Sequence, residues 1–195
     1  MEGDLARISA FILEVDRLKT VLRKTRPVAI GRYENSAEHS WQVSLLALLF
    51  IDHAIEPVDI QRVVEILLVH DIPEIEIGDV IVYAPPDPER AQAEVAAARD
   101  IFGMLPEPQA ATCFERWLEY ERRDTPESRY AYAVDRLMPL LHNLEAAGAG
   151  WRENRVSLDR VLTINSAIGE ALPTVWEQVR ADILAHAEGG GFDSI

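Results

Sequence analysis

Residues 66–71 read ILLVHD, an apolar run that ends in a histidine and an aspartate. A second apolar stretch, YAYAVDRLM at 130–138, is interrupted by Asp135. A buried carboxylate is costly unless a cation or hydrogen-bond donor pairs with it. A divalent cation held by two imidazoles and two carboxylates would be such a partner, and His39 supplies the second imidazole. The sequence therefore predicts a metal-dependent enzyme.

Each of these residues also has a simpler explanation. A single histidine in an apolar helix, such as His39 or His70, is more often a core residue bonded to a backbone carbonyl. Asp135 could lie in solvent at a helix bend. Arg136 is rotated by about 100° from Asp135 on a helix, so we expect it to be a poor partner. We favour a metal site because two histidines and two aspartates in apolar surroundings occur together.

The adjacent pair His70 and Asp71 restricts where the site can lie. Neighbouring helical residues point in different directions, so both can reach one ion only where a helix ends. Pro73 predicts such an end. Glu74 and Asp79 follow closely, and both acids could reach the same cavity.

Helical periodicity runs through nearly the whole chain. We find no alternating strand pattern, no repeat and no linker, which predicts an all-α fold with one domain over residues 1–195. The core is expected at about 18–144, with C-terminal helices at about 157–187 packed on it. The earlier helices are expected at about 4–22, 37–54, 59–70, 74–78, 88–103, 107–123 and 126–147.

Composition narrows the functional classes. The chain has 195 residues, 48% of them apolar, and no run long enough to span a membrane. The acidic N-terminus lacks a signal-peptide pattern, so we expect a cytoplasmic protein. The single cysteine, Cys113, excludes an intrachain disulfide and neither requires nor excludes an oxidising compartment. The net charge of −14 argues against a nucleic-acid polymer as partner.

One basic segment stands out in this acidic chain. It contains no acid and holds both lysines of the protein. It could capture a phosphate, although a solvated helix face followed by a loop explains it equally well. Its members are Arg17, Lys19, Arg23, Lys24, Arg26 and Arg32.

Two longer motifs resemble a known family. RYENSAEHS at 32–40 and HDIPEIEIGD at 70–79 are similar to motifs of the HD-domain phosphohydrolases, in the branch of the bacterial 5′-deoxynucleotidases and their eukaryotic relatives. The family is recognised by a scattered His…His-Asp…Asp set. The resemblance covers roughly 18–144 and implies an HD-domain helical bundle.

The resemblance also implies roles for individual residues. It implies one divalent transition metal. The metal could be Mn, Co, Fe, Ni or Zn, because a set of nitrogen and oxygen ligands binds all of these ions. Glu74 and Asp79 would be the catalytic acids, with their division of roles open. The metal ligands would be His39, His70, Asp71 and Asp135. The candidate phosphate-binding residues are Arg23, Lys24 and Arg32.

The activity implied is release of phosphate from nucleoside 5′-monophosphates. We expect deoxynucleotides, although the family's Arg-Trp pair is replaced by Arg23-Lys24, which leaves the sugar preference open. A homodimer is implied by the same resemblance. Trp41 is expected to pack in the core.

Other functions remain open at this point. One is a cyclic-nucleotide or alarmone hydrolase, or a di-iron oxygenase, whose second metal would need further histidines. His142 shares the helix face of Asp135 and is the candidate for that role. Another is a non-catalytic nucleotide-binding protein, which would have no need of Glu74 and Asp79.

Overall fold

The computed structural model describes residues 2–192, and within them every regular element is helical, as predicted. Met1 and residues 193–195, which the predicted domain includes, lie outside the described residues. The helices are α1 (Asp4–Val15), η1 (Asp16–Thr20), α2 (Ser36–Phe50), η2 (Ile51–His53), α3 (Ile60–Val69), α4 (Glu74–Ile77), α5 (Pro88–Phe102), α6 (Gln109–Arg122), α7 (Pro126–Glu145), α8 (Ala149–Glu153), α9 (Leu158–Asn165), α10 (Ile168–Ala171) and α11 (Pro173–Glu188).

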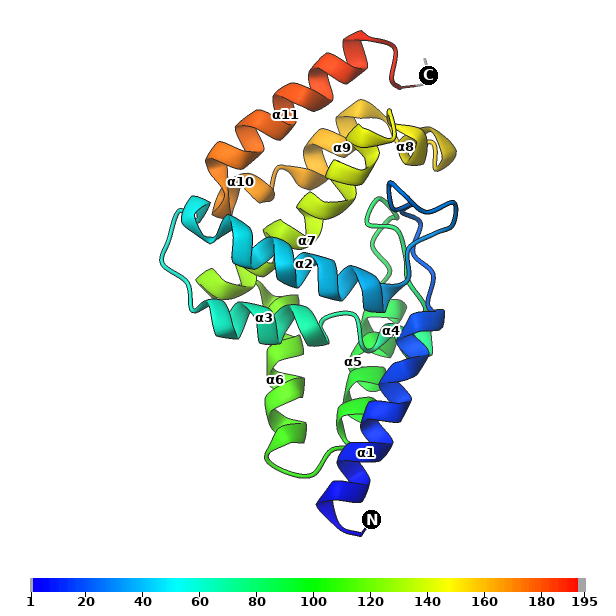
Figure 1. Cartoon of the computed structure of the whole chain (residues 1–195), viewed down its shortest axis with the longest axis vertical. Coiled ribbons are helices and arrows are strands. Elements are labelled where there is room, and N and C mark those ends of the chain that lie inside the picture. The colour runs from blue at the N-terminus through cyan, green and yellow to red at the C-terminus, as the bar shows by residue number, and fades with distance from the viewer. Residues whose placement is uncertain (1, 193–195) are drawn as a thin grey trace.

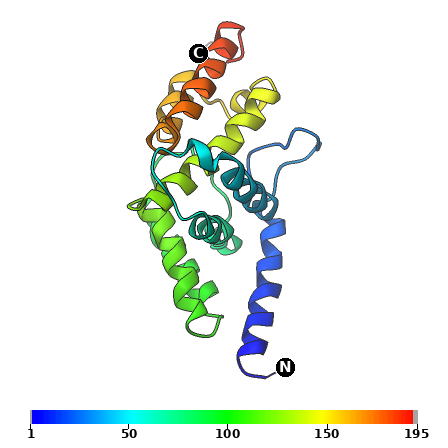
Figure 2. The same ribbon diagram turned by 60° about the vertical axis from the view of Figure 1, so that its left-hand side comes forward.

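The molecule is elongated, with its two ends at opposite ends of the long axis (Figure 1). Helices α2, α3 and α7 form the middle, α1, α5 and α6 extend toward the N-terminal end, and α8 to α11 cover the other end. A rotated view shows the same division, with α1 lying apart from the C-terminal helices (Figure 2). The middle helices therefore meet neighbours from both halves of the chain.

Two apolar clusters stabilise this arrangement, and α3 takes part in both. Ile66 and Leu67 are fully buried in the cluster formed with α2, α7, α10 and α11. Val69 packs against the second cluster, which α1, α4, α5 and α6 build. His70 and Asp71 follow directly, so the end of α3 is held from two sides.

The start of α2 is fixed by a cap that the sequence predicts. The Asn35 side chain accepts a hydrogen bond from the Glu38 backbone N–H at 3.0 Å, and the Glu38 carboxylate accepts one from the Asn35 backbone N–H at 2.8 Å. This reciprocal pair satisfies backbone donors that a helix start leaves free. It holds the first turn, which carries His39, in a defined orientation.

Two details differ from the sequence-based expectation. The C-terminal region is divided into α9, α10 and α11, and α11 begins at Pro173, which has no backbone N–H to donate. Trp41, expected in the core, has 64% of its surface exposed. Because α2 is apolar on most sides, its sequence could not show which face is buried. No helix within residues 2–192 is both long and apolar enough to cross a bilayer.

Candidate metal centre

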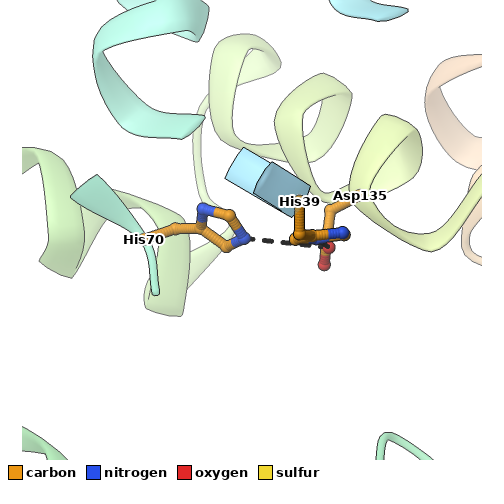
Figure 3. Close-up of side chains that lie close together, drawn as sticks. All are labelled: His39, His70 and Asp135. Atoms are coloured by element: carbon orange, nitrogen blue, oxygen red, sulfur yellow. Dashed lines mark hydrogen bonds and ion pairs between the residues drawn. The ribbon is translucent and has the colours of Figure 1, made fainter. Parts of the chain in front are cut away.

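Three of the four predicted ligands meet in the middle of the molecule. One ligand atom each from His39, His70 and Asp135 lies within 4.8 Å of the other two, and all three residues are buried. Figure 3 shows both imidazole rings directed at the Asp135 carboxylate. His39 Nε2 lies 2.8 Å and His70 Nε2 lies 3.7 Å from Asp135 Oδ1. Residues up to 96 positions apart in the chain are thus brought together.

The His70 ring has a defined orientation. Its Nδ1 lies 2.8 Å from the carbonyl oxygen of Leu67, which can only accept a hydrogen bond, so Nδ1 carries a hydrogen. His70 Nε2 therefore faces the site, where it is buried without a hydrogen-bond partner. Burial lowers the pKa of this imidazole, but the charges of Asp71 and Asp135 outweigh it and raise the pKa to about 9. The site thus attracts positive charge.

Asp71, the fourth predicted ligand, lies at the edge of this cluster. Its Oδ1 is 3.1 Å from His70 Nε2, while its Oδ2 accepts a hydrogen bond from Arg23 Nη1 at 2.7 Å. It does not belong to the group of three whose ligand atoms are mutually close. One of its oxygens remains directed toward His70, and the other is held by the guanidinium.

Asp135 has more partners than the sequence suggests. The Tyr120 hydroxyl donates to Asp135 Oδ2 at 2.5 Å, and the Arg136 guanidinium donates to the same oxygen. The expectation that Arg136 would be a poor partner is wrong, because its long side chain folds back onto the carboxylate. Burial raises the pKa of Asp135, but Arg136 and His39 outweigh it and hold that pKa well below its usual range. Oδ1 is left for the histidines.

The two predicted catalytic acids lie beside the cluster. Glu74, the first residue of α4, accepts a hydrogen bond from the Ser36 hydroxyl at 2.6 Å. Burial and the neighbouring Asp71 charge raise the pKa of Glu74 to about 8. Asp79 lies 3.7 Å from Arg23 Nη1, and burial raises its pKa as well. Glu74 can therefore hold a proton near neutral pH, and Asp79 binds a proton more readily than an ordinary aspartate.

Both acids line an open pocket. Arg23 and Lys24 line it, as does Arg136, which the sequence did not suggest. Arg32 is not among its lining residues; its guanidinium pairs with the Glu38 carboxylate at 2.6 and 2.8 Å. The remainder of the lining is mixed polar and aromatic and includes Tyr83, Asn143, Trp151, Asn154 and Asn165.

The residues present fit a divalent cation. Ligand atoms bound to one ion at about 2.1 Å lie roughly 3–4 Å apart, and the observed spacing is close to that. An unprotonated His70 Nε2 and Asp71 Oδ1 at 3.1 Å would repel each other, so the arrangement needs positive charge between them. Histidine and carboxylate ligands suit a transition metal, without selecting one.

No second metal cluster occurs among residues 2–192. His142, the candidate for one, is buried and its Nδ1 has no hydrogen-bond partner, but it belongs to no group of three mutually close ligands. The described histidines His53 and His186 belong to none either.

Besides Arg136, two residues at the site were not identified from the sequence. Tyr120 contacts Asp135 from α6, and no local pattern connects those two residues. Glu34 is fully buried beside His39, although it belongs to the RYENSAEHS motif. The position of Glu34 directly before the N-cap of α2 was the one feature of the sequence that could have indicated its place beside His39.

Comparisons with known proteins show which proteins this chain resembles. The chain is 28% identical over 120 residues to the human 5′-deoxynucleotidase HDDC2, a match that covers 60% of this chain and 56% of the human protein. The match thus spans little more than half of that relative's length. The yeast 5′-deoxynucleotidase YBR242W is 29% identical over 148 residues, which cover 71% of this chain and 59% of that protein.

Solved structures extend the likeness to nearly the whole chain. A structure from Magnetospirillum magnetotacticum, titled a predicted metal-dependent phosphohydrolase, superposes with a TM-score of 0.92 at 38% identity, covering 99% of this chain and 100% of that one. A conserved hypothetical protein from Pyrococcus furiosus shares the fold, with a TM-score of 0.65 at 21% identity over 89% of this chain and 99% of that chain. The HD domain family model matches residues 15–176. The chain belongs to the HD domain family.

Proposed function

We propose that this protein is a metal-dependent phosphohydrolase that releases phosphate from nucleoside 5′-monophosphates, with deoxynucleotides as the expected substrates. The observation that carries the proposal is the convergence of His39, His70 and Asp135. Asp71 contacts this group through His70 and lines a pocket together with Glu74 and Asp79. The relatives named 5′-deoxynucleotidases support the substrate class.

The chain supplies the parts that such a reaction needs. His39, His70, Asp71 and Asp135 would hold the ion. When bound, a divalent cation activates water and neutralises charge on a phosphoryl oxygen. Lys24 lines the pocket, and its ammonium nitrogen lies 5.9 Å from the centre of the Tyr33 ring, where its charge would be available to the phosphate. Buried Arg23 contacts four carboxylates, which limits its freedom to bind one more anion.

Glu74 and Asp79 would supply the acid and the base. Both are protonated more readily than ordinary carboxylic acids, which suits proton transfer near neutral pH. Loss of the base removes the acidic limb of a pH–rate profile, and loss of the acid removes the alkaline limb. Comparing Glu74→Gln with Asp79→Asn would therefore assign the two roles.

The decisive experiment is a phosphate-release assay on the intact protein. The protein is stripped with a chelator, reloaded separately with Mn, Co, Fe, Ni or Zn, and offered matched ribo- and deoxyribonucleoside 5′-monophosphates. We expect turnover that depends on metal and is lost in Asp71→Ala. Tight nucleotide binding without turnover under any metal would instead indicate a non-catalytic binding protein.

We also propose a homodimer and a cytoplasmic location. Four large apolar side chains share one exposed face of α2, which supports a contact with a second copy. Light scattering on the wild type and on Leu49→Glu tests the dimer, which the charge should disrupt. A monomeric wild type would contradict it. The four residues are Trp41, Leu45, Leu48 and Leu49.

A further inference from the structure

Glu34 is a fully buried carboxylate without a conventional hydrogen bond. Neither of its oxygens has a hydrogen-bond partner, and its exposed fraction is 0%. Its Oε2 lies 3.3 Å from His39 Nδ1 and 3.4 Å from Arg23 Nε. A buried charge held this loosely lowers stability relative to an apolar side chain of similar size. A role other than stabilising the fold would account for it.

Local backbone structure places Glu34 against His39. Glu34 directly precedes the N-cap Asn35, and His39 is the fourth residue of α2. These are the two positions at which apolar side chains commonly pack together to fix the entry of a helix. Here the pair is a carboxylate and an imidazole, so the same geometry places a hydrogen-bond acceptor 3.3 Å from a ring nitrogen.

Backbone pairing holds Glu34 from its other side. The Arg23 N–H donates to the Glu34 carbonyl at 2.8 Å, and the Glu34 N–H donates to the Thr25 carbonyl at 2.9 Å. The side chains of Arg23 and Glu34 therefore enter the site together. Contact with Glu34 at Nε leaves Arg23 Nη1 to donate to Asp71.

Both histidines direct Nε2 into the site, but the groups that face their Nδ1 atoms differ. His70 directs Nε2 into the site because its Nδ1 donates to the Leu67 carbonyl. His39 also directs Nε2 into the site, 2.8 Å from Asp135 Oδ1, and the group facing its Nδ1 is Glu34. Which ring nitrogen of a histidine can bind a metal is set by the hydrogen bond at the other nitrogen.

We propose that Glu34 is a positioning residue that keeps the hydrogen of His39 on Nδ1 and its ring fixed, so that Nε2 presents a lone pair to the metal. The inference rests on the proposed metal centre. Glu34 touches neither the ion nor the substrate. It acts through His39 and, by its contact with Arg23, keeps Asp71 oriented as well.

The test is the affinity of the metal-free protein for Mn²⁺ or Zn²⁺ alone, measured by calorimetry or by competition with a coloured chelator. Glu34→Met keeps the volume and removes the acceptor, whereas Glu34→Gln keeps a neutral acceptor oxygen. Glu119→Gln is the matched control. Glu119 is also buried, but it pairs with Arg62 and Thr125 away from the ion site.

We expect Glu34→Met to bind metal about 10- to 100-fold more weakly. Its metal-free form should unfold at the same or a higher denaturant concentration than wild type, because a poorly paired buried charge is removed. Glu34→Gln should lie between Glu34→Met and wild type. Glu119→Gln should keep its metal affinity within about twofold even where its stability falls, because its partners are structural.

Wild-type affinity in Glu34→Met would overturn the inference and leave the proposed function intact. An equal loss of affinity in Glu119→Gln would overturn it too, because the effect would then be general destabilisation. If wild type binds no metal, the proposed function and this inference fail together. Should Glu34→Met not fold, the metal affinity of Glu34→Gln decides: weaker binding than in wild type supports the inference, and wild-type affinity overturns it.

Discussion

Tyr120 on α6 and Asp135 on α7 are joined by a hydrogen bond of 2.5 Å between the tyrosine hydroxyl and Oδ2 of the carboxylate. Both residues are buried, and Oδ1 of the same carboxylate is 2.8 Å from His39 Nε2. The tyrosine therefore determines which oxygen of Asp135 faces the histidines. This contact connects the helix that covers the site with the helix that supplies a ligand.

Tyr120→Phe tests that contact. The substitution leaves the ring and removes one hydrogen bond to a buried charge, so we expect the free energy of unfolding to fall by about 1–3 kcal/mol. Metal affinity should fall as well, because Asp135 can rotate. Denaturant titration of the metal-free protein and calorimetry with Zn²⁺ measure the two effects. Tyr132→Phe is the control, since that tyrosine contacts Arg123 and Arg136 through its ring face. Unchanged values in Tyr120→Phe would contradict a positioning role for Tyr120.

Metal removal should reduce both activity and stability. A ligand that binds only the folded state stabilises it by about 2.7 kcal/mol at one hundred times its dissociation constant. We therefore expect Mn²⁺ or Zn²⁺ to raise the melting temperature of wild type and not that of His70→Ala. His53→Ala, at an exposed histidine outside the site, should respond like wild type. A shift that persists in His70→Ala would place the ion elsewhere.

Glu74 should make the metal-free protein less stable as the pH rises. Burial and Asp71 raise its pKa in the folded state to about 8, whereas Arg23 opposes them. The unfolded chain releases this proton near pH 4.5. The contribution to stability is thus complete below about pH 4.5 and is lost as the pH rises toward 8.

Glu74→Gln removes this titration. In chelator, its stability relative to wild type should increase between pH 5 and pH 8 by about 2 kcal/mol, since one pKa unit corresponds to about 1.4 kcal/mol and part of the shift relaxes on ionisation. Denaturant titrations at the two pH values provide the measurement. A difference between variant and wild type that is the same at both pH values would show that Glu74 titrates normally.

Lys24 and Arg32 should differ in their effect on substrate binding. Lys24 lines the pocket, whereas Arg32 pairs with Glu38 on the exposed side of the α2 cap. We expect Lys24→Met to raise KM for a nucleoside monophosphate about 10-fold, the value of one charge-assisted hydrogen bond. Arg32→Met should change KM by less than about twofold because its interaction is a surface pair. A larger rise in KM for Arg32→Met than for Lys24→Met would show that Arg32 moves to the phosphate when substrate binds.

The sequence by itself determined the helical architecture and indicated which polar residues would be buried. Periodic apolar residues and caps such as Asn35 act over one or two turns, so they can be recognised locally. The apolar surroundings of His70 and Asp135 revealed that these polar groups would be buried and would need partners.

Only the tertiary structure decided which side chains meet. The contacts of Asp135 with Tyr120 and of Glu34 with Arg23 depend on how helices pack and on which way long side chains fold. The prediction for Trp41 was wrong because a helix that is apolar on most sides does not show in its sequence which face is buried. The prediction for Arg136 was wrong because its long side chain can fold back onto Asp135, whichever way it leaves the helix. The local periodicity of the sequence determines where helices form. The orientation of a side chain at the site depends on neighbours that are distant in sequence.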